Sequence, residues 1–403
     1  MRVAVTGLGV VSALGVDRAA FWEGLAAGRS GIGPVDRVDL SDFRFQHAAQ
    51  AHAYRPEDHF EPRDLRPLDR FAQFAVVAAR EAVADAGLDG PVRDRTAVIA
   101  GVSTPGQDTL DGEVFTPLYK EGRTRIPPLS IPKAMANGNT SAVTMDLGLR
   151  GPAFTVSSAC SSASHAIGQG LWMLRNGVAD AAVVGGSEAP MSYANLRGWE
   201  ALRVVSPDTC RPFSVDRDGM TIGEGAAMLV LEPLDAARAR GATIYAELAG
   251  VGMSSDAGHL TTPSAEGASA AVRAALADAR MDPSEVGYVN AHGTATQIND
   301  PMEAEALRTV LGDRLADVPV SSTKSMHGHT LGAAGAVEAA ATVLALYHGV
   351  LPPTANFTTL DPACAPLDVV ANEAREVQVE AALSNSFAFG GLNAVLAFRR
   401  ADA

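Results

Sequence analysis

The sequence contains little cysteine and less positive than negative charge. Its only cysteines among 403 residues are Cys160, Cys210 and Cys364, too few and too scattered for a disulfide framework. No CxxC pair or His/Cys metal-ligand spacing is present, so we expect no metal site and a reducing, cytoplasmic location. Lys and Arg number 32 against 46 Asp and Glu, and the formal net charge of −14 argues against non-specific nucleic-acid binding.

Long apolar runs are also lacking. The nearest candidate for a membrane span, residues 331–351, is interrupted by Glu338 and His348 and is typical of a buried helix. The chain starts with a strand-like segment and no charged-then-apolar leader, so we expect neither secretion nor membrane insertion.

Nucleotide-binding motifs are incomplete. Residues 7–9 (Gly-Leu-Gly) follow a strand pattern as in a dinucleotide-binding loop, but Ser12 occupies the place of the third glycine. Residues 27–30 offer no carboxylate for a ribose, and no GxxxxGK[ST] motif occurs. We therefore expect no nucleotide and no redox cofactor.

The most informative segment is residues 156–168, where a β-type stretch passes through Cys160 into small residues at helical spacing. Such a junction can place a thiol at a helix N-terminus, where unpaired N–H groups and the helix dipole favour a reactive thiolate near neutral pH. The alternative is a buried structural cysteine, which is the commoner fate of an isolated Cys.

Two histidine segments favour the catalytic interpretation. An apolar strand over residues 286–289 leads to His292 among small residues, and the Gly/Ala-rich residues 321–336 contain Lys324 and His329. Taken singly, each His could be a core or surface residue, and the Gly/Ala-rich stretch could serve helix packing. A Cys, two His and a Lys that all lie at predicted element ends together indicate an active site.

At these residues the chain resembles the elongating β-ketoacyl-[acyl carrier protein] synthases, the condensing enzymes of fatty acid and polyketide assembly. The resemblance extends over nearly the whole chain and includes residues 3–9, 131–137 and 384–391. It implies an α/β thiolase fold with a duplicated five-layered α-β-α-β-α architecture. Residues 80–89 and 273–282 are similar in sequence and form a weak internal repeat, which such a duplication would leave. We place the boundary near residues 246–250, which gives halves 1–247 and 248–403.

The resemblance also implies a mechanism. Cys160 would hold an acyl group as a thioester, and the backbone N–H groups of Cys160 and Phe389 would form the oxyanion hole. His292 and His329 would bind the malonyl thioester carbonyl while carbon dioxide leaves. Lys324 would organise the site, and Glu338 matches a buried acidic residue near that lysine, although it could be an ordinary helix carboxylate.

The reaction implied is a decarboxylative Claisen condensation that lengthens an acyl chain in type II polyketide or fatty acid synthesis. A housekeeping fatty acid enzyme, or a ketosynthase active only beside a non-catalytic chain-length factor, remains an alternative. The sequence disfavours a thiolase, which needs a second reactive Cys near the C-terminus, and an initiating synthase, which usually has Asn in place of His329. The partners implied are an acyl carrier protein with phosphopantetheine-bound acyl and malonyl groups, and a second copy in a homodimer or a chain-length factor in a heterodimer.

Substrate-shaping positions depart from the family pattern. Ala388 stands where glycine is usual, and Asn299 and Asp300 resemble polyketide members, so we expect an altered acyl preference in specialised metabolism. The insertion at residues 101–137 has a loop-rich composition. The residues expected to bind or gate substrate are Phe387, Ala388, Phe389, Thr294, Thr296, Leu110, Val114 and Phe115. Basic residues that could bind the carrier protein, or be ordinary surface charges, are Arg63, Arg66, Arg70, Lys120, Arg123, Arg125 and Lys133.

Overall fold

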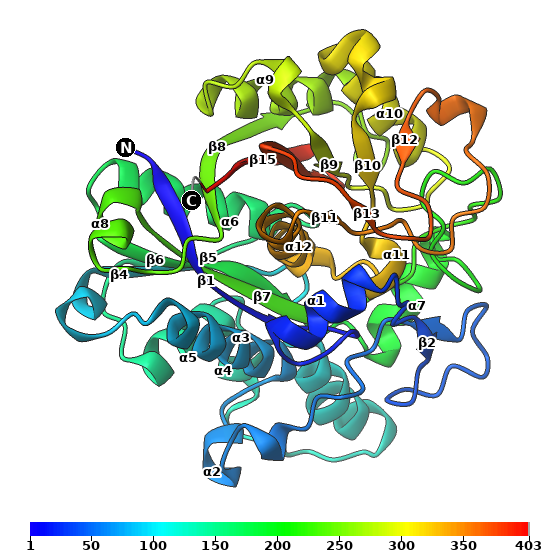
Figure 1. The fold of residues 1–403 in the computed structure, drawn as a ribbon. Helices are drawn as coiled ribbons and strands as arrows, with labels where there is room; N and C mark the ends of the chain where they lie inside the picture. The colour runs from blue at the N-terminus through cyan, green and yellow to red at the C-terminus, as the bar shows by residue number, and fades with distance from the viewer. Residues whose placement is uncertain (402–403) are drawn as a thin grey trace.

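The computed structural model describes residues 1–401 and shows two similar β-sheets, continuous at one edge as a single 11-stranded sheet, with helices between and around them (Figure 1). The strand order of the first sheet is β5-β4-β6-β7-β1, and that of the second is β10-β9-β14-β15-β8, with β12 added outside β10. Antiparallel pairing of β1 with β8 joins them. The strands of these sheets are β1 (Val3–Val11), β4 (Thr96–Gly101), β5 (Ala153–Val156), β6 (Ala181–Glu188), β7 (Gly225–Pro233), β8 (Ala246–Ser255), β9 (Tyr288–Asn290), β10 (Pro319–Ser321), β12 (Asp368–Val369), β14 (Ala381–Ala388) and β15 (Leu392–Arg400). Two small two-stranded sheets pair β2 (Gly33–Pro34) with β3 (His47–Ala48) and β11 (Val350–Leu351) with β13 (Arg375–Glu376).

The order and direction of the strands repeat from one sheet to the other. In the first, β4 is parallel to β5 and β6, whereas β7 is antiparallel to β6 and β1. In the second, β9 is parallel to β10 and β14, and β15 is antiparallel to β14 and β8. This repetition is the duplication that the weak internal repeat at residues 80–89 and 273–282 suggested.

The helices form three layers, above, between and below the sheets in Figure 1. α3 and α5 cover the first sheet, α9 covers the second with α10 packed on it, and α6 and α12 lie between the sheets and contact strands of both. The helices are α1 (Arg18–Ala26), α2 (Pro62–Leu65), α3 (Arg70–Ala86), η3 (Thr109–Lys120), α4 (Ser130–Ala134), α5 (Gly138–Leu147), α6 (Ser162–Arg175), α7 (Tyr193–Leu202), α8 (Leu234–Ala239), α9 (Ala265–Asp278), α10 (Asn299–Leu311), α11 (Lys324–His327) and α12 (Ala334–His348). The five-layered α/β arrangement expected from the sequence is therefore present.

Matched contacts between strand and helix relate the two halves in detail. Asp85 on α3 accepts a hydrogen bond from the Leu8 N–H at 3.0 Å, and Asp278 on α9 accepts one from the Val251 N–H at 2.9 Å. A Cβ on Gly9 would lie 2.0 Å from the Ala78 carbonyl oxygen, so α3 can approach β1 only because glycine stands there. The glycines of residues 7–9 thus lie inside a strand and make room for a helix.

The structure adds detail to two expectations about chain organisation. The boundary between residues 247 and 248 falls inside β8, and the repeated strand order favours a second half that begins with this strand, at Ala246. The insertion expected to be loop-rich contains the π-helix η3, which includes Pro117. A hydrogen bond fixes the first residue of this helix, because the Thr109 N–H donates to the Asp69 carboxylate at 2.9 Å.

The long apolar segment is the central helix. Residues 334–346 of α12 are all buried, and the stretch Leu331–His348, which is apolar enough to cross a membrane, is 89% buried inside the protein. Its hydrophobicity on every side reflects its place between two sheets. The expectation of a buried helix is confirmed.

Candidate active site

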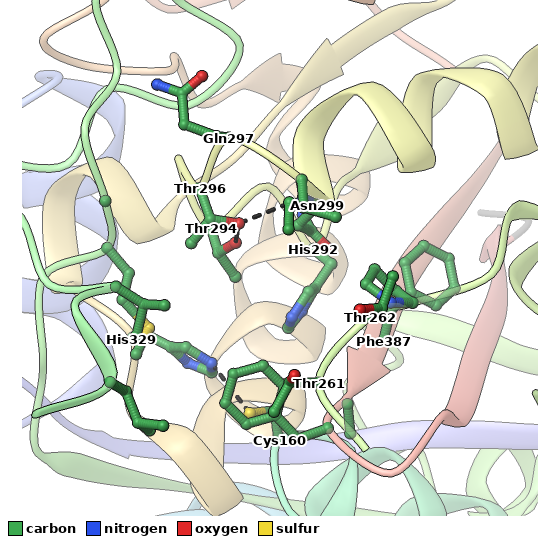
Figure 2. Close-up of a pocket in the computed structure, with 18 of the residues that line it drawn as sticks. Cys160, Thr261, Thr262, His292, Thr294, Thr296, Gln297, Asn299, His329 and Phe387 are labelled. Carbon is green, nitrogen blue, oxygen red and sulfur yellow. Dashed lines mark hydrogen bonds between the residues drawn. The ribbon is translucent and has the colours of Figure 1, made fainter. Parts of the chain in front are cut away.

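Three of the five expected catalytic side chains, Cys160, His292 and His329, line one cavity of about 390 Å³ (Figure 2). Cys160 precedes α6, His292 follows β9, and His329 follows α11, so both halves contribute. Ala159 has a φ of +51°, a left-handed conformation that L-residues adopt only when the surroundings require it. The chain therefore turns sharply just before the thiol and presents it to the cavity.

Cys160 and His329 are in direct contact. The His329 Nε2 lies 3.1 Å from the Cys160 Sγ, and Figure 2 shows the ring pointing at the sulfur. The His329 Nδ1 lies 3.2 Å from the Leu331 N–H, which can only donate, so Nδ1 accepts and the ring proton is on Nε2. Burial and the charge of Lys324 hold the pKa of His329 well below its usual value. His329 is thus a neutral N–H donor aimed into the cavity.

His292 has the same protonation for a different reason. The Lys324 Nζ lies 3.3 Å from the His292 Nδ1, and because an ammonium group has no acceptor, Nδ1 accepts and Nε2 carries the proton. Burial, followed by the charge of Lys324, lowers the pKa of His292 well below its usual value. The two imidazole rings lie 5.5 Å apart at 85°. The site therefore holds two neutral imidazole donors beside a thiol.

Lys324 is completely buried and has polar partners. Its Nζ donates to the His292 carbonyl oxygen at 2.7 Å and forms an ion pair with Glu338 on α12. Burial raises the pKa of Glu338 to about 7 even though Lys324 favours its ionised form. The ion pair fixes Lys324 so that it holds both the ring and the backbone of His292.

The state of the thiol differs from the sequence-based expectation of a thiolate. Cys160 is only 8% exposed, and burial raises the pKa of its thiol to about 12. The charge of Lys324 and the nearby Phe389 backbone N–H lower this pKa but do not offset the loss of solvation. Burial of Cys160 therefore favours the neutral thiol over the thiolate at neutral pH.

Comparison with known proteins decides the family. The family model described as "Beta-ketoacyl synthase, N-terminal domain" matches residues 1–237, and "Beta-ketoacyl synthase, C-terminal domain" matches residues 245–358. The chain belongs to the β-ketoacyl synthase family. It is therefore an acyltransferase with the thiolase fold, as expected from the sequence.

The synthase is similar over its whole length to proteins with different roles. It is 47% identical over 401 residues to "Nodulation protein E" of Rhizobium sp. (strain N33), covering 99% of each chain. It is 40% identical to "3-oxoacyl-[acyl-carrier-protein] synthase 2" of Staphylococcus aureus (strain MRSA252), covering 100% of this chain and 99% of the relative. Among solved structures, "The ishigamide ketosynthase/chain length factor" superposes with a TM-score of 0.94 at 37% identity, covering 100% and 99% of the two chains.

Several buried carboxylates that hold the site together were not singled out from the sequence of the synthase. Glu303 on α10 accepts the backbone N–H groups of His292 and Gly293, each at 2.8 Å. Glu188, at the end of β6, accepts the N–H groups of Ser103 at 2.8 Å and Gly332 at 2.8 Å. The available signal was a carboxylate in a segment otherwise expected to be buried, which requires hydrogen-bond partners.

The expected gate residues lie around the cavity of the synthase, and the insertion residues do not. Phe387, Ala388 and Phe389, at the end of β14, line the cavity together with Thr294 and Thr296, whose hydroxyl oxygens lie 3.1 Å apart. An unanticipated contact is the indole of Trp199 on α7, stacked on the Phe389 ring with centroids 6.3 Å apart. Three predicted residues do not line this cavity, and all three are on η3: Leu110, Val114 and the exposed Phe115.

The basic residues considered for carrier binding have different surroundings. Arg70 is buried and bonded to Glu224 through two nitrogens, so the structure removes it from any surface patch. Lys133 pairs with Glu113 and is mostly covered. Arg66 and Arg125 are exposed, whereas the others have surface partners: Arg63 with Asp64, Arg123 with Glu121, and Lys120 over the Tyr193 ring. An exposed cation missed by the sequence analysis is Arg203, which lines the cavity mouth.

Proposed function

We propose that the synthase condenses an acyl group held on Cys160 with a malonyl unit presented by an acyl carrier protein. The observation that carries this proposal is the meeting of one thiol and two neutral imidazole N–H donors in one cavity. The family supports a condensation reaction; the assignment of individual residues rests on the geometry.

In the first step, Cys160 takes the acyl group from the carrier protein. The sulfur attacks the thioester carbonyl carbon, a new C–S bond forms, and the bond to the phosphopantetheine sulfur breaks. The Cys160 proton leaves with the departing thiol, so charge is balanced. Negative charge develops on the carbonyl oxygen, and the backbone N–H groups of Cys160 and Phe389 are the donors we assign to it. The Phe389 backbone N–H lies where it favours the anionic form of the Cys160 sulfur, which supports this assignment.

In the second step, the two histidines act on the malonyl thioester. The Nε2–H groups of His292 and His329 donate to its carbonyl oxygen, and the C–C bond to the carboxylate breaks to release carbon dioxide. The electron pair of that bond forms an enolate, which the two donors stabilise. The enolate carbon attacks the acyl–Cys160 carbonyl, and the Cys160 sulfur leaves as a thiolate, which takes up one proton from solvent to restore the resting thiol. Neutral imidazoles suit this role because each must donate a hydrogen bond without consuming a proton.

The carrier protein would dock at the cavity mouth. Arg203 lies there exposed, and within residues 1–401 no carboxylate forms an ion pair with it. A free arginine suits a phosphate group or an acidic protein surface. Arg66 and Arg125 are the other exposed cations we assign to docking. They would offset locally the repulsion expected between an acidic carrier protein and a chain of net charge −14.

We assign a homodimer formed along β5. This strand lies at the edge of the sheet, and its first two residues are exposed. Large apolar side chains are exposed on it and on neighbouring elements, including Phe154, Met145 and Phe115. Unpaired strand edges with apolar neighbours are typical of interfaces. A heterodimer with a chain-length factor is the second candidate, favoured by the close superposition on the ishigamide ketosynthase/chain length factor.

For the pathway, we favour specialised chain elongation over housekeeping fatty acid synthesis. The identity to a nodulation protein is 47%, against 40% to a synthase named for acyl carrier protein. Ala388 lines the cavity beside Phe389, which supports an altered acyl preference. Three free cysteines suit a reducing compartment, and we place the protein in the cytoplasm. The test is the set of acyl groups that Cys160 accepts from carrier proteins loaded with saturated, unsaturated and β-keto chains.

A further inference from the structure

His329 is held through its backbone by the extended residues 221–223. The His329 N–H donates to the Thr221 carbonyl oxygen at 2.7 Å, and the Gly223 N–H donates to the His329 carbonyl oxygen at 2.9 Å. These bonds fix His329 on both sides of its Cα. Because the ring must reach Cys160 at 3.1 Å, the placement of Thr221 and Gly223 determines whether that contact forms.

The residues around this segment are closely packed. A Cβ on Gly223 would lie 2.6 Å from the His327 carbonyl oxygen, and a Cβ on Gly328 would lie 2.7 Å from the Ala49 Cβ. Both sites accept only glycine, so the backbones of three segments are in direct contact. A displacement of residues 221–223 would therefore be passed on to His329, since close-packed interiors transmit strain.

The far end of this segment is anchored by a buried ion pair. Glu224 is completely buried, and its carboxylate receives the Arg70 Nε at 2.9 Å and Nη2 at 2.7 Å. The Ala51 N–H donates to the same carboxylate at 3.1 Å. The guanidinium group lies over the Phe74 ring, 4.6 Å from its centroid. A bidentate pair fixes orientation as well as distance, so Arg70 defines where Glu224 sits.

We propose that Arg70 is a positioning residue for His329, acting through Glu224 and residues 221–223. This role replaces the carrier-binding role expected from the sequence. It depends on the proposed function of His329 in decarboxylation, and its own failure can be separated from a failure of that function.

The test is a double-mutant cycle on carbon dioxide release from malonyl-carrier protein, using the full-length enzyme. Arg70→Met should lower the rate about tenfold in the wild-type background, because a small misplacement of a catalytic group is costly. In the His329→Ala background the same substitution should change the rate by less than about twofold, because the residue it positions is gone. Arg70→Lys keeps the positive charge but cannot pair with Glu224 through two nitrogens, so it should lower the rate less than Arg70→Met does.

The matched control is Arg80→Met. Arg80 lies on the same helix and forms its own two-nitrogen pair with Asp146, with its guanidinium over the Phe60 ring. Its third hydrogen bond goes to the His59 carbonyl oxygen, away from residues 221–224. Its loss should therefore change the rate by less than about twofold in both backgrounds.

The outcomes separate the two claims. The positioning role is overturned if Arg70→Met leaves the wild-type rate unchanged, or if it costs as much without His329 as with it. If His329→Ala itself retains the wild-type rate, the proposed function of His329 fails. Thermal melting identifies variants that do not fold. Should Arg70→Met be one of them, Arg70→Lys is measured in the same cycle and must lose rate only in the presence of His329.

Discussion

The His329 Nε2 lies 3.1 Å from the Cys160 Sγ and carries its proton, because the Leu331 N–H occupies Nδ1. The histidine is therefore placed to donate to sulfur or substrate rather than to act as a resting base. The thiol keeps its proton because burial raises its pKa to about 12. This geometry supports the proposal that Cys160 accepts the acyl group and that the imidazoles bind the malonyl carbonyl.

The thiol pKa predicts a pH profile. Below a pKa of about 12 the thiolate fraction rises tenfold per pH unit, so alkylation of Cys160 by iodoacetamide should rise about a hundredfold between pH 7 and 9 without a plateau. The Cys160→Ala protein reports the contribution of Cys210 and Cys364. A plateau near neutral pH would instead mean that the helix N-terminus holds a thiolate, as the sequence alone suggested.

The two histidines should be separable from the cysteine by half-reaction. Replacing His292 or His329 by Ala should slow carbon dioxide release by about two to three orders of magnitude, because each removes one donor from the developing enolate. Acyl transfer to Cys160 should survive, since its oxyanion donors are backbone N–H groups. An equal loss in both half-reactions would contradict this division of labour.

The buried Lys324–Glu338 pair should be costly to break from one side. Lys324→Met leaves the Glu338 carboxylate buried without its cation, and unfolding in denaturant should show a loss of about 3–5 kcal/mol. The double variant Lys324→Met with Glu338→Gln should recover stability but not carbon dioxide release, because His292 still lacks the group that holds Nδ1. Recovery of both would show that Lys324 matters only for the fold.

Arg66, Arg125 and Arg203 should affect only substrates delivered by a carrier protein. Charge reversal to Glu at each should raise KM for acyl-carrier protein and leave a short thioester mimic unaffected, because the mimic lacks an acidic surface. Reversal of Arg63, already paired with Asp64, is the matched control and should have a smaller effect. Equal effects on both substrates would place these residues outside the docking surface.

Ala388 should influence which acyl chains enter. It is the last residue of β14, buried beside the Phe389 that stacks on Trp199. Ala388→Gly gives the backbone more freedom next to this gate, so longer acyl groups should be accepted more readily. Adduct masses from a chain-length series measure this, and an unchanged profile would remove residue 388 from the gate.

Sequence reasoning predicted the candidate reacting groups that the structure brings together, Cys160, His292, Lys324 and His329, because they lie at element ends among small residues, which is a local signal. A second local signal was the weak internal repeat, in which Asp85 and Asp278 occupy equivalent positions. Each accepts a hydrogen bond from the equivalent strand of its own half.

What sequence reasoning missed depends on burial. Arg70 looks like a surface cation in the chain, and only the packing of α3 against Glu224 shows that it is internal. The state of the Cys160 thiol likewise depends on how completely distant segments exclude water, which the helix-terminus argument does not include. Glu303 bonds to the backbone of residues ten and eleven positions away, so no short motif contains the relationship.

The most direct test of the central claim is intact-protein mass after incubation with a panel of saturated, unsaturated and β-keto acyl carrier proteins, comparing wild type with Cys160→Ala. The account predicts a single acyl adduct on the wild-type protein and none on the variant, with the preferred acyl group distinguishing fatty acid from specialised elongation. An adduct that persists without Cys160, or the absence of any adduct from every donor, would contradict the assignment of Cys160 as the acyl acceptor of this chain.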